Sequence, residues 1–348
     1  MTGDAAVAPS AAPSLAPSAG ASAGPVTRTP AVHPDSGELV RAAGAGSVRA
    51  VARLLSRIEA GGDAARSVSA ALAGRQREAR IVGLTGAPGV GKSTVTSALV
   101  RHARRAGRRV AVLAVDPSSP FSGGALLGDR VRMAEHATDR DVYIRSLSSR
   151  GRLGGLSAAT PAAVDALAAL GFDLVLVETV GVGQNEVDVL SLADTVLLVL
   201  APGMGDEIQA AKAGILEIAD VLLVNKADHE HAAATVRELT GMLALGRSGR
   251  QRPGEWRVPV QRSVATRGDG IDEVAAVLDR HHAHLVTSGE LEERRRRRIA
   301  AAVRAAVSDR FAAELDRRPP GAADGLDDVH LLADRWWAGL AGGAQDGG

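Results

Sequence analysis

Short apolar runs alternate with stretches of helical periodicity between residues 80 and 285. The runs are apolar almost throughout, which is typical of strands that are buried on both faces. Such strands form parallel sheets that carry helices on both sides, so the pattern predicts an α/β fold with a mostly parallel, doubly wound sheet. The predicted strands are Ile81–Leu84, Val110–Val115, Val142–Leu147, Phe172–Val177, Thr195–Ala201, Val221–Val224 and Val258–Val260.

The segments that flank this region differ from it in composition. Residues 1–36 are rich in Ala, Pro and Ser and are predicted to be a disordered head, because they cannot bury enough apolar surface to offset the entropy of ordering. Residues 37–78 show helical spacing and predict an N-terminal helical segment ahead of the main domain at 79–285. Residues 286–340 predict a charged C-terminal helical extension, and 341–348 a flexible tail. The head has no basic start and no continuous apolar stretch, so a signal peptide is not expected.

Charge and residue usage exclude several functional classes. The net charge is +1, which gives no support for nucleic-acid binding. The absence of cysteine excludes disulfides, a thiol nucleophile and cysteine-ligated metals. No apolar stretch approaches the ~20 residues that cross a bilayer, so no membrane association is expected. Only Lys92, Lys212 and Lys226 among the 41 basic residues are lysine, which indicates that lysine is kept where a compact ammonium group is required.

The stretch from Gly86 to Ser93, GAPGVGKS, matches the phosphate-binding pattern GxxxxGK[ST]. It follows an apolar strand, Arg80–Thr85, and opens a helix that is predicted over Thr94–Ala106. The glycines allow backbone N–H groups to converge on phosphates, Lys92 can reach the β- and γ-phosphates, and the Ser93 hydroxyl can bind Mg²⁺. The motif predicts a P-loop NTPase whose nucleotide contacts are Gly86, Ala87, Pro88, Gly89, Val90, Gly91, Lys92, Ser93 and Thr94.

A second motif, Asn225-Lys226-Ala-Asp228, ends a later strand and resembles the NKxD motif of GTPases. The Asp228 carboxylate can accept hydrogen bonds from the N1–H and the exocyclic amine of guanine, whereas adenine would leave it unpaired. The Lys226 stem can lie along the base, and Asn225 can tie this loop to the P-loop. Ser263 and Ala265 follow the last predicted strand, where the Ala265 amide is a candidate donor to the guanine oxygen. These residues predict GTP or GDP, with Mg²⁺, as the bound cofactors.

Four longer stretches extend the pattern beyond these motifs. Residues 115–133 read VDPSSPFSGGALLGDRVRM, 144–156 read IRSLSSRGRLGGL, 177–186 read VETVGVGQNE, and 203–214 read GMGDEIQAAKAG. Together they closely resemble the methylmalonyl-CoA mutase-associated GTPases, the MeaB/ArgK family. The resemblance covers about residues 37–320 and leaves out the Pro-rich head and the last residues.

The resemblance implies a Mg²⁺-dependent GTPase that acts as a chaperone of an adenosylcobalamin-dependent acyl-CoA mutase of the methylmalonyl-CoA mutase type. Such a protein gates cofactor loading and protects or reactivates the mutase. Family members are typically homodimers, which makes the extension at 286–340 a candidate dimerisation arm, and we expect the protein in the cytoplasm. Two alternatives stay open: a GTPase or kinase linked to arginine or ornithine transport, and a metal-insertion GTPase. The NKxD motif disfavours an ATP-dependent kinase, and the lack of cysteine disfavours a metal carrier.

The predicted catalytic residues are Lys92, Glu178 and Gly181. Glu178 ends a predicted strand at the position where many GTPases carry aspartate. We expect it to orient the attacking water or to bind Mg²⁺ through water, and the Gly181 N–H to sense the γ-phosphate, because phosphoryl transfer depends mainly on positioning and charge neutralisation.

The predicted magnesium ligands include two further carboxylates. Asp116 ends the second strand, which is expected to lie next to the P-loop strand, and Asp129 lies in the following loop. Asp116 could instead cap the turn before a proline, and Asp129 could be a solvated loop charge. The complete candidate set is Ser93, Asp116, Asp129 and Glu178.

Other charged residues have less specific assignments. Lys212 is a candidate for a nucleotide-dependent ion pair that faces the mutase, or else a solvated helix charge. The loop arginines Arg145, Arg150 and Arg152 are candidates for stabilising transition-state charge or for holding the partner, or else belong to an ordinary surface loop. The arginine run at 294–298 is expected to be a solvated helix face that is paired with neighbouring glutamates.

Overall fold

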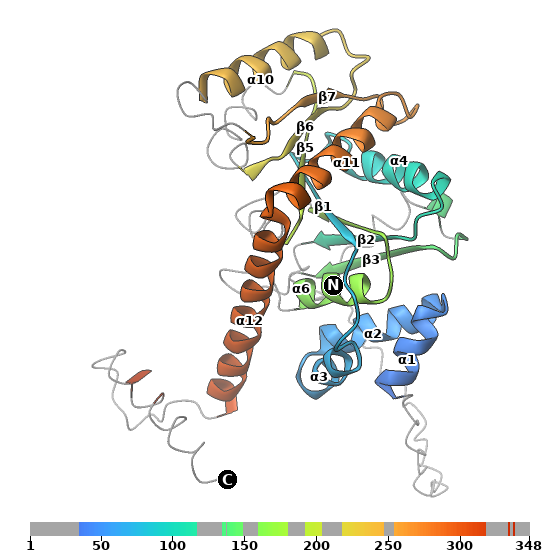
Figure 1. The fold of residues 1–348 in the computed structure, drawn as a ribbon, viewed down its shortest axis with the longest axis vertical. Coiled ribbons are helices and arrows are strands. Elements are labelled where there is room, and N and C mark those ends of the chain that lie inside the picture. Colours follow the sequence, from blue (N-terminus) through green and yellow to red (C-terminus); the bar gives the residue numbers. More distant parts are fainter. Residues whose placement is uncertain are drawn as a thin grey trace, which may run out of the picture. The chain divides into compact units, whose positions relative to one another are not determined.

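The centre of the protein is a seven-stranded sheet in the order β3-β2-β4-β1-β5-β6-β7, with every neighbouring pair parallel (Figure 1). This arrangement confirms the predicted α/β class. The strands are β1 (Arg80–Thr85), β2 (Val110–Asp116), β3 (Val142–Ser148), β4 (Leu174–Thr179), β5 (Thr195–Leu200), β6 (Val221–Val224) and β7 (Val260–Arg262). The computed structural model describes residues 35–116, 134–136, 138–148, 159–179, 192–203, 218–246, 254–317, 333–334 and 337.

The strand order corrects one expectation. The strand that ends at Asp116 does not adjoin the P-loop strand, because β4 pairs with both β1 and β2 and so separates them. An apolar run that is buried on both faces fits many neighbours, so the sequence pattern does not determine which strands pair. As a result Glu178, and not Asp116, is the acidic residue beside the C-terminal end of β1, where it is in register with Leu84.

The last strand begins later than the predicted range Val258–Val260, since β7 starts at Val260. The residue before it, Pro259, has no N–H to donate to a sheet ladder. Its carbonyl still accepts a hydrogen bond from the Leu222 N–H at 3.0 Å. Pro259 therefore accepts a hydrogen bond at the edge of the sheet but donates none, and β7 starts two residues later than predicted.

Helices cover both faces of the sheet. On one face α4 (Lys92–Arg105) and α11 (Ile271–Ser288) share a core with apolar side chains of the strands, such as Val82 and Leu84. On the other face α6 (Ala159–Ala169) packs with a helical cluster that precedes the sheet. None of the described helices is long and apolar enough to cross a membrane. The remaining helices are α1 (Ser36–Gly44), α2 (Val48–Ala60), α3 (Gly62–Ala71), α10 (Ala232–Gly246), α12 (Glu290–Arg317) and the short 3-10 turn η1 (Ala134–His136).

An aspartate stands immediately before each of three strands and accepts a backbone N–H at or just before the start of a neighbouring strand. The Asp173 carboxylate, before β4, accepts the Arg109 N–H at 2.6 Å. The Asp194 carboxylate, before β5, accepts the Ile81 N–H at 3.0 Å. The Asp220 carboxylate, before β6, accepts the Val196 N–H at 2.8 Å. Each bond satisfies an N–H group at the start of a strand and fixes how that strand aligns with its neighbour.

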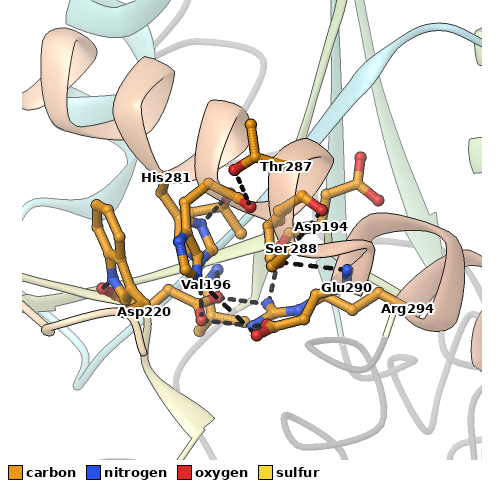
Figure 2. Close-up of polar contacts among 12 residues, drawn as sticks. Asp194, Val196, Asp220, His281, Thr287, Ser288, Glu290 and Arg294 are labelled. Carbon is orange, nitrogen blue, oxygen red and sulfur yellow. Dashed lines mark hydrogen bonds and ion pairs between the residues drawn. The ribbon is translucent and has the colours of Figure 1, made fainter. Parts of the chain in front are cut away.

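Two arginines of α12 bind two of these aspartates. Arg294 donates from both terminal nitrogens to Asp220, at 2.7 and 2.8 Å (Figure 2), and Arg298 donates to Asp194 at 3.0 Å. The expectation of a solvated arginine run is therefore wrong for these two, which are four residues apart and share one face of the helix. It is right for Arg297, which is 72% exposed and donates to Glu293.

The Asp220 carboxylate lies in a buried polar cluster between α11, α12 and the sheet (Figure 2). His281 Nε2 is 3.4 Å from Asp220 Oδ1, and His281 Nδ1 is 2.8 Å from the Thr195 hydroxyl. The Trp256 indole N–H donates to the Asp220 carbonyl at 2.8 Å. Burial raises the pKa of the Asp220 carboxyl, but the His281 ring and the Arg294 guanidinium together lower it by more. The pKa of Asp220 is therefore below its ordinary value. Asp220 is therefore a charged, fully partnered group that fastens α11 and α12 to the strand edge.

Candidate functional site

The P-loop runs from the end of β1 to the first turn of α4, and its glycines are required by close packing. Gly86 has φ +141°, and a Cβ there would lie 2.0 Å from the Val199 carbonyl oxygen. Gly91 has φ +95°, and a Cβ there would lie 2.5 Å from Asn225 Nδ2. Both glycines have a left-handed backbone, and at Gly86 a Cβ would clash with a fixed backbone carbonyl, whereas at Gly91 it would displace the Asn225 amide. The loop is consequently pressed against β5 and the NKxD loop.

Lys92 is the first residue of α4, and its side chain is buried within the P-loop. Its ammonium group donates to the Gly86 carbonyl at 2.7 Å and to the Ala87 carbonyl at 3.0 Å. The positive charge therefore lies inside the curve of the loop, at the N-terminus of a helix whose dipole also favours an anion. This arrangement is suited to bind the phosphates of a nucleotide.

The structure brings two of the predicted magnesium ligands together. The Ser93 hydroxyl donates to Glu178 Oε1 at 2.6 Å, and both side chains are buried. Thr96, one turn further along α4, has its hydroxyl 3.1 Å from Glu178 Oε2. Sequence reasoning missed Thr96, although its spacing of three residues from Ser93 places both hydroxyls on one face of α4. The set of oxygen donors beside the phosphate loop fits Mg²⁺, which prefers hydroxyl, carboxylate and water ligands.

The remaining predicted residues of this region are only partly described. Asp116 ends β2, which is adjacent to the Glu178 strand β4, and its backbone pairs with Ser148 of β3. Asp129 and Gly181 lie outside the described residues, as do Lys212, Arg150 and Arg152.

Arg145 is described, and its place corrects the expectation of a loop arginine. It lies within β3 and binds α2, where it donates to the Ala52 carbonyl at 3.0 Å and the Ser56 hydroxyl at 3.1 Å and forms an ion pair with Glu59. Arg145 therefore attaches the N-terminal helices to the sheet.

Asn225 joins three loops at one buried point. Its Nδ2 donates to the Val90 carbonyl of the P-loop at 2.9 Å. Its Oδ1 accepts from the Ser263 hydroxyl and from the Ala265 N–H, each at 3.1 Å. The link from Asn225 to the P-loop is the one that the sequence suggested. The Ala265 amide, in contrast, is engaged with Asn225 in this structure, and its contact with a guanine oxygen stays a prediction.

A cavity of about 400 Å³ opens beside this junction. Asp228 faces it from the NKxD loop, and Lys226 has a left-handed backbone, φ +56°, that lets its ammonium donate to the Gly89 carbonyl at 2.9 Å. Arg267, which sequence reasoning missed, lies 3.3 Å from Asp228. The cavity has the size and the carboxylate that a purine base requires. Its lining residues are Gly91, Thr94, Asn225, Lys226, Asp228, His229, Val264, Ala265 and Thr266.

The parallel sheet and the phosphate loop between β1 and α4 define a P-loop NTPase. The family model described as "Methylmalonyl Co-A mutase-associated GTPase MeaB" matches residues 49–319. The chain belongs to this family, and it is a GTP-hydrolysing enzyme.

Individual relatives agree with this placement. A protein of Pyrococcus abyssi is 47% identical over 279 residues, which are 80% of this chain and 86% of that protein. The mouse mitochondrial methylmalonic aciduria type A homolog is 40% identical over 214 residues, which are 62% of this chain and 52% of that protein. A crystal structure of an LAO/AO transport system kinase has a TM-score of 0.64 at 25% identity and covers 82% of this chain and 87% of that one.

Proposed function

We propose that this GTPase is a chaperone of an adenosylcobalamin-dependent acyl-CoA mutase of the methylmalonyl-CoA mutase type. In this role it would act in the cytoplasm, gate cofactor loading, and protect or reactivate the mutase. The observation that carries the proposal is the family match over residues 49–319, supported by a base cavity that Asn225 ties to the phosphate loop. The mouse relative, whose name refers to methylmalonic aciduria, supports a mutase of the methylmalonyl-CoA type as the partner.

The site residues divide the hydrolysis reaction between them. Lys92 and the P-loop amides bind the β- and γ-phosphates, and Asp228 reads the base. Ser93 and Glu178, with Asp116 and Asp129 as further candidates, would hold Mg²⁺, which supplies positive charge to the phosphate oxygens.

Glu178 is our candidate for the group that orients the attacking water, and the Gly181 N–H is the proposed sensor of the γ-phosphate. Thr96 and Ser93 hold the Glu178 carboxylate from two sides, so its position is set before substrate binds. Lys212 remains our candidate for an ion pair that changes with the nucleotide and faces the mutase.

A homodimer is part of this proposal. Exposed apolar side chains recur along α12 at intervals of four or eight residues, where they form a strip on the helix surface. An apolar strip of this kind on a long helix is typical of an interface between subunits. The strip consists of Ile299, Val303, Val307 and Leu315.

The decisive experiment measures GTP and ATP turnover, each with and without a cobalamin-loaded acyl-CoA mutase. We expect slow GTP hydrolysis that rises when the mutase is present, and little ATP hydrolysis. GTP turnover that no mutase changes would contradict the chaperone function. Lys212→Arg serves as a second test, because unchanged stimulation and unchanged mutase protection in this variant would remove Lys212 from the proposal.

A kinase linked to amino-acid transport is the second candidate, because a solved structure with the same fold is titled as an LAO/AO transport system kinase. ATP turnover equal to GTP turnover, together with transfer of phosphate to a protein acceptor, would favour it. The Asp228 carboxylate in the base cavity argues for guanine and thus against it.

A further inference from the structure

The residue beside the base-reading carboxylate comes from a different loop. Arg267 follows β7 and places Nη1 3.3 Å from Asp228 Oδ2. It does not line the base cavity, so it reaches Asp228 from the side and leaves the cavity itself open. The contact of Arg267 with the base site is therefore its bond to Asp228.

A tight turn holds Arg267 in place. The Arg267 N–H and the Gly268 N–H both donate to the Val264 carbonyl, at 2.9 and 3.0 Å, and the Val264 N–H donates to the Asp269 carbonyl at 2.9 Å. The Arg267 side chain also donates from Nε to Asp269 Oδ2 at 2.8 Å. One guanidinium thus bridges Asp269 and Asp228, which a lysine ammonium on a flexible stem could not do with the same geometry.

The same turn is continuous with the loop that faces the base. Val264 and Ala265 line the cavity, and the Ala265 N–H is bonded to Asn225. The orientation of Arg267 is consequently fixed by the segment that closes one wall of the cavity.

Asp228 can bind Arg267 and a guanine at the same time. An ionised carboxylate has about four acceptor positions. The guanine N1–H and exocyclic amine would occupy one on each oxygen, so a position on Oδ2 remains for Arg267. With the guanidinium in place the carboxylate has less freedom to rotate away from the two base donors.

We propose that Arg267 is a positioning residue for base selectivity, which holds the Asp228 carboxylate in the orientation that accepts both guanine donors. The inference rests on the proposed assignment of Asp228 to guanine. It goes beyond that assignment in giving selectivity to a residue outside the NKxD motif and outside the cavity.

The test compares GDP with IDP, which has the N1–H but no exocyclic amine. In Arg267→Gln we expect the ratio of GDP affinity to IDP affinity to fall about threefold to fivefold, which is the upper end of what an ion pair between exposed side chains contributes, since Arg267 is 56% and Asp228 49% exposed. The kcat for GTP should stay unchanged while KM rises, because Arg267 touches no reacting group. Asp269→Asn should shift the ratio in the same direction, and Arg267→Lys should restore it only in part.

Arg237→Gln is the matched control, since Arg237 is an exposed arginine of α10 outside the cavity lining. An affinity ratio in Arg267→Gln that equals the ratio in this control would overturn the inference. So would an equal rise in GDP and IDP affinity, because Arg267 would then block Asp228 instead of orienting it. A wild-type protein that binds ADP as well as GDP would refute the guanine assignment itself. Normal selectivity without mutase stimulation would refute only the chaperone function.

Discussion

Replacement of Arg298 by methionine tests how α12 is attached to the sheet. Arg298 is 4% exposed, and its Nη1 donates to Asp194 Oδ1 at 3.0 Å and to the Leu192 carbonyl at 3.1 Å. Asp194 is 1% exposed, so the variant leaves its carboxylate buried with the Ile81 N–H as its one hydrogen-bond donor among the described residues, and it also removes the cation 3.4 Å from the Asp165 carboxylate. Methionine keeps much of the side-chain volume and removes the charge. Breaking a buried ion pair in this way costs about 3–5 kcal/mol of the free energy of unfolding.

Urea unfolding monitored by far-UV circular dichroism would measure the loss. The matched control is Arg297→Met, one residue earlier on the same helix, where the side chain is 72% exposed and donates to Glu293. An exposed pair of this kind contributes about 0.5 kcal/mol or less. Equal losses in the two variants would refute the idea that the buried charge pair fastens the helix.

A double-mutant cycle separates the charge pair from simple packing. Asp194→Asn keeps an oxygen that can accept the Ile81 N–H, and it removes the charge that Arg298 neutralises. Combining it with Arg298→Met should cost less than the sum of the single changes, with a coupling of about 1–3 kcal/mol. A coupling of zero would mean that Arg298 stabilises the protein through its other contacts, which are the Leu192 carbonyl, the Asp165 carboxylate 3.4 Å from its Nε, and packing.

Three further predictions concern titration, the phosphate loop and the magnesium site. The pKa of Asp220 is lower in the folded protein than its ordinary value of 3.8, so its charge stabilises the fold above about pH 4. This contribution is lost as the pH falls through the folded-state pKa. In urea unfolding between pH 6 and pH 3, Asp220→Asn should therefore lose less free energy of unfolding than the wild type, and an equal dependence on pH would contradict this. Gly86→Ala should cut GDP affinity at least tenfold and lower the melting temperature, because its Cβ would lie 2.0 Å from a β5 carbonyl. Gly89→Ala carries left-handed backbone strain as well, at φ +82°, but nothing lies within 4 Å of its new Cβ, so it should lower the melting temperature by less; equal effects would contradict the packing argument. Glu178→Gln should slow GTP turnover roughly 10–100-fold and raise the Mg²⁺ concentration that gives the half-maximal rate. GDP binding in the presence of EDTA should stay unchanged. An unaltered Mg²⁺ dependence of the rate would show that Glu178 is not part of the metal site.

The amino-acid pattern predicted the strands well and their order poorly. Each apolar run became a parallel strand, because burial on both faces leaves an uninterrupted apolar signal. The same uniformity hides which strand pairs with which, and this is why the expectation that β2 adjoins β1 failed. Two strands, β4 and β7, start two residues later than predicted, at Leu174 and Val260. The shift of β7 had a readable cause, since Pro259 has no N–H for the ladder.

The site was predictable where one short motif carries the chemistry. The P-loop and the NKxD loop fall into this class, and Asn225 connects them as the sequence suggested. Thr96, Arg267 and Arg298 were missed because their partners lie far away in the chain or in another loop.

Weak signals for the missed contacts were nevertheless present. Arg294 and Arg298 are spaced by four residues, which places them on one face of a helix. An aspartate also stands just before three of the apolar runs. Neither signal predicts that these arginines bind these aspartates, since that depends on how α12 packs against the sheet.

The arginine–aspartate contacts of α12 also have a consequence for the order in which the chain is assembled. Asp194 and Asp220 are separated from their arginines by 104 and 74 residues, so the ribosome makes the strands long before the cations that neutralise them. Until residues 294–298 emerge, closing the sheet would bury two carboxylates without their arginines, at a cost that favours the open chain. The first turns of α12 thus complete the sheet: a chain that stops before Arg294 should be less stable and more open to proteolysis than one that includes Arg298.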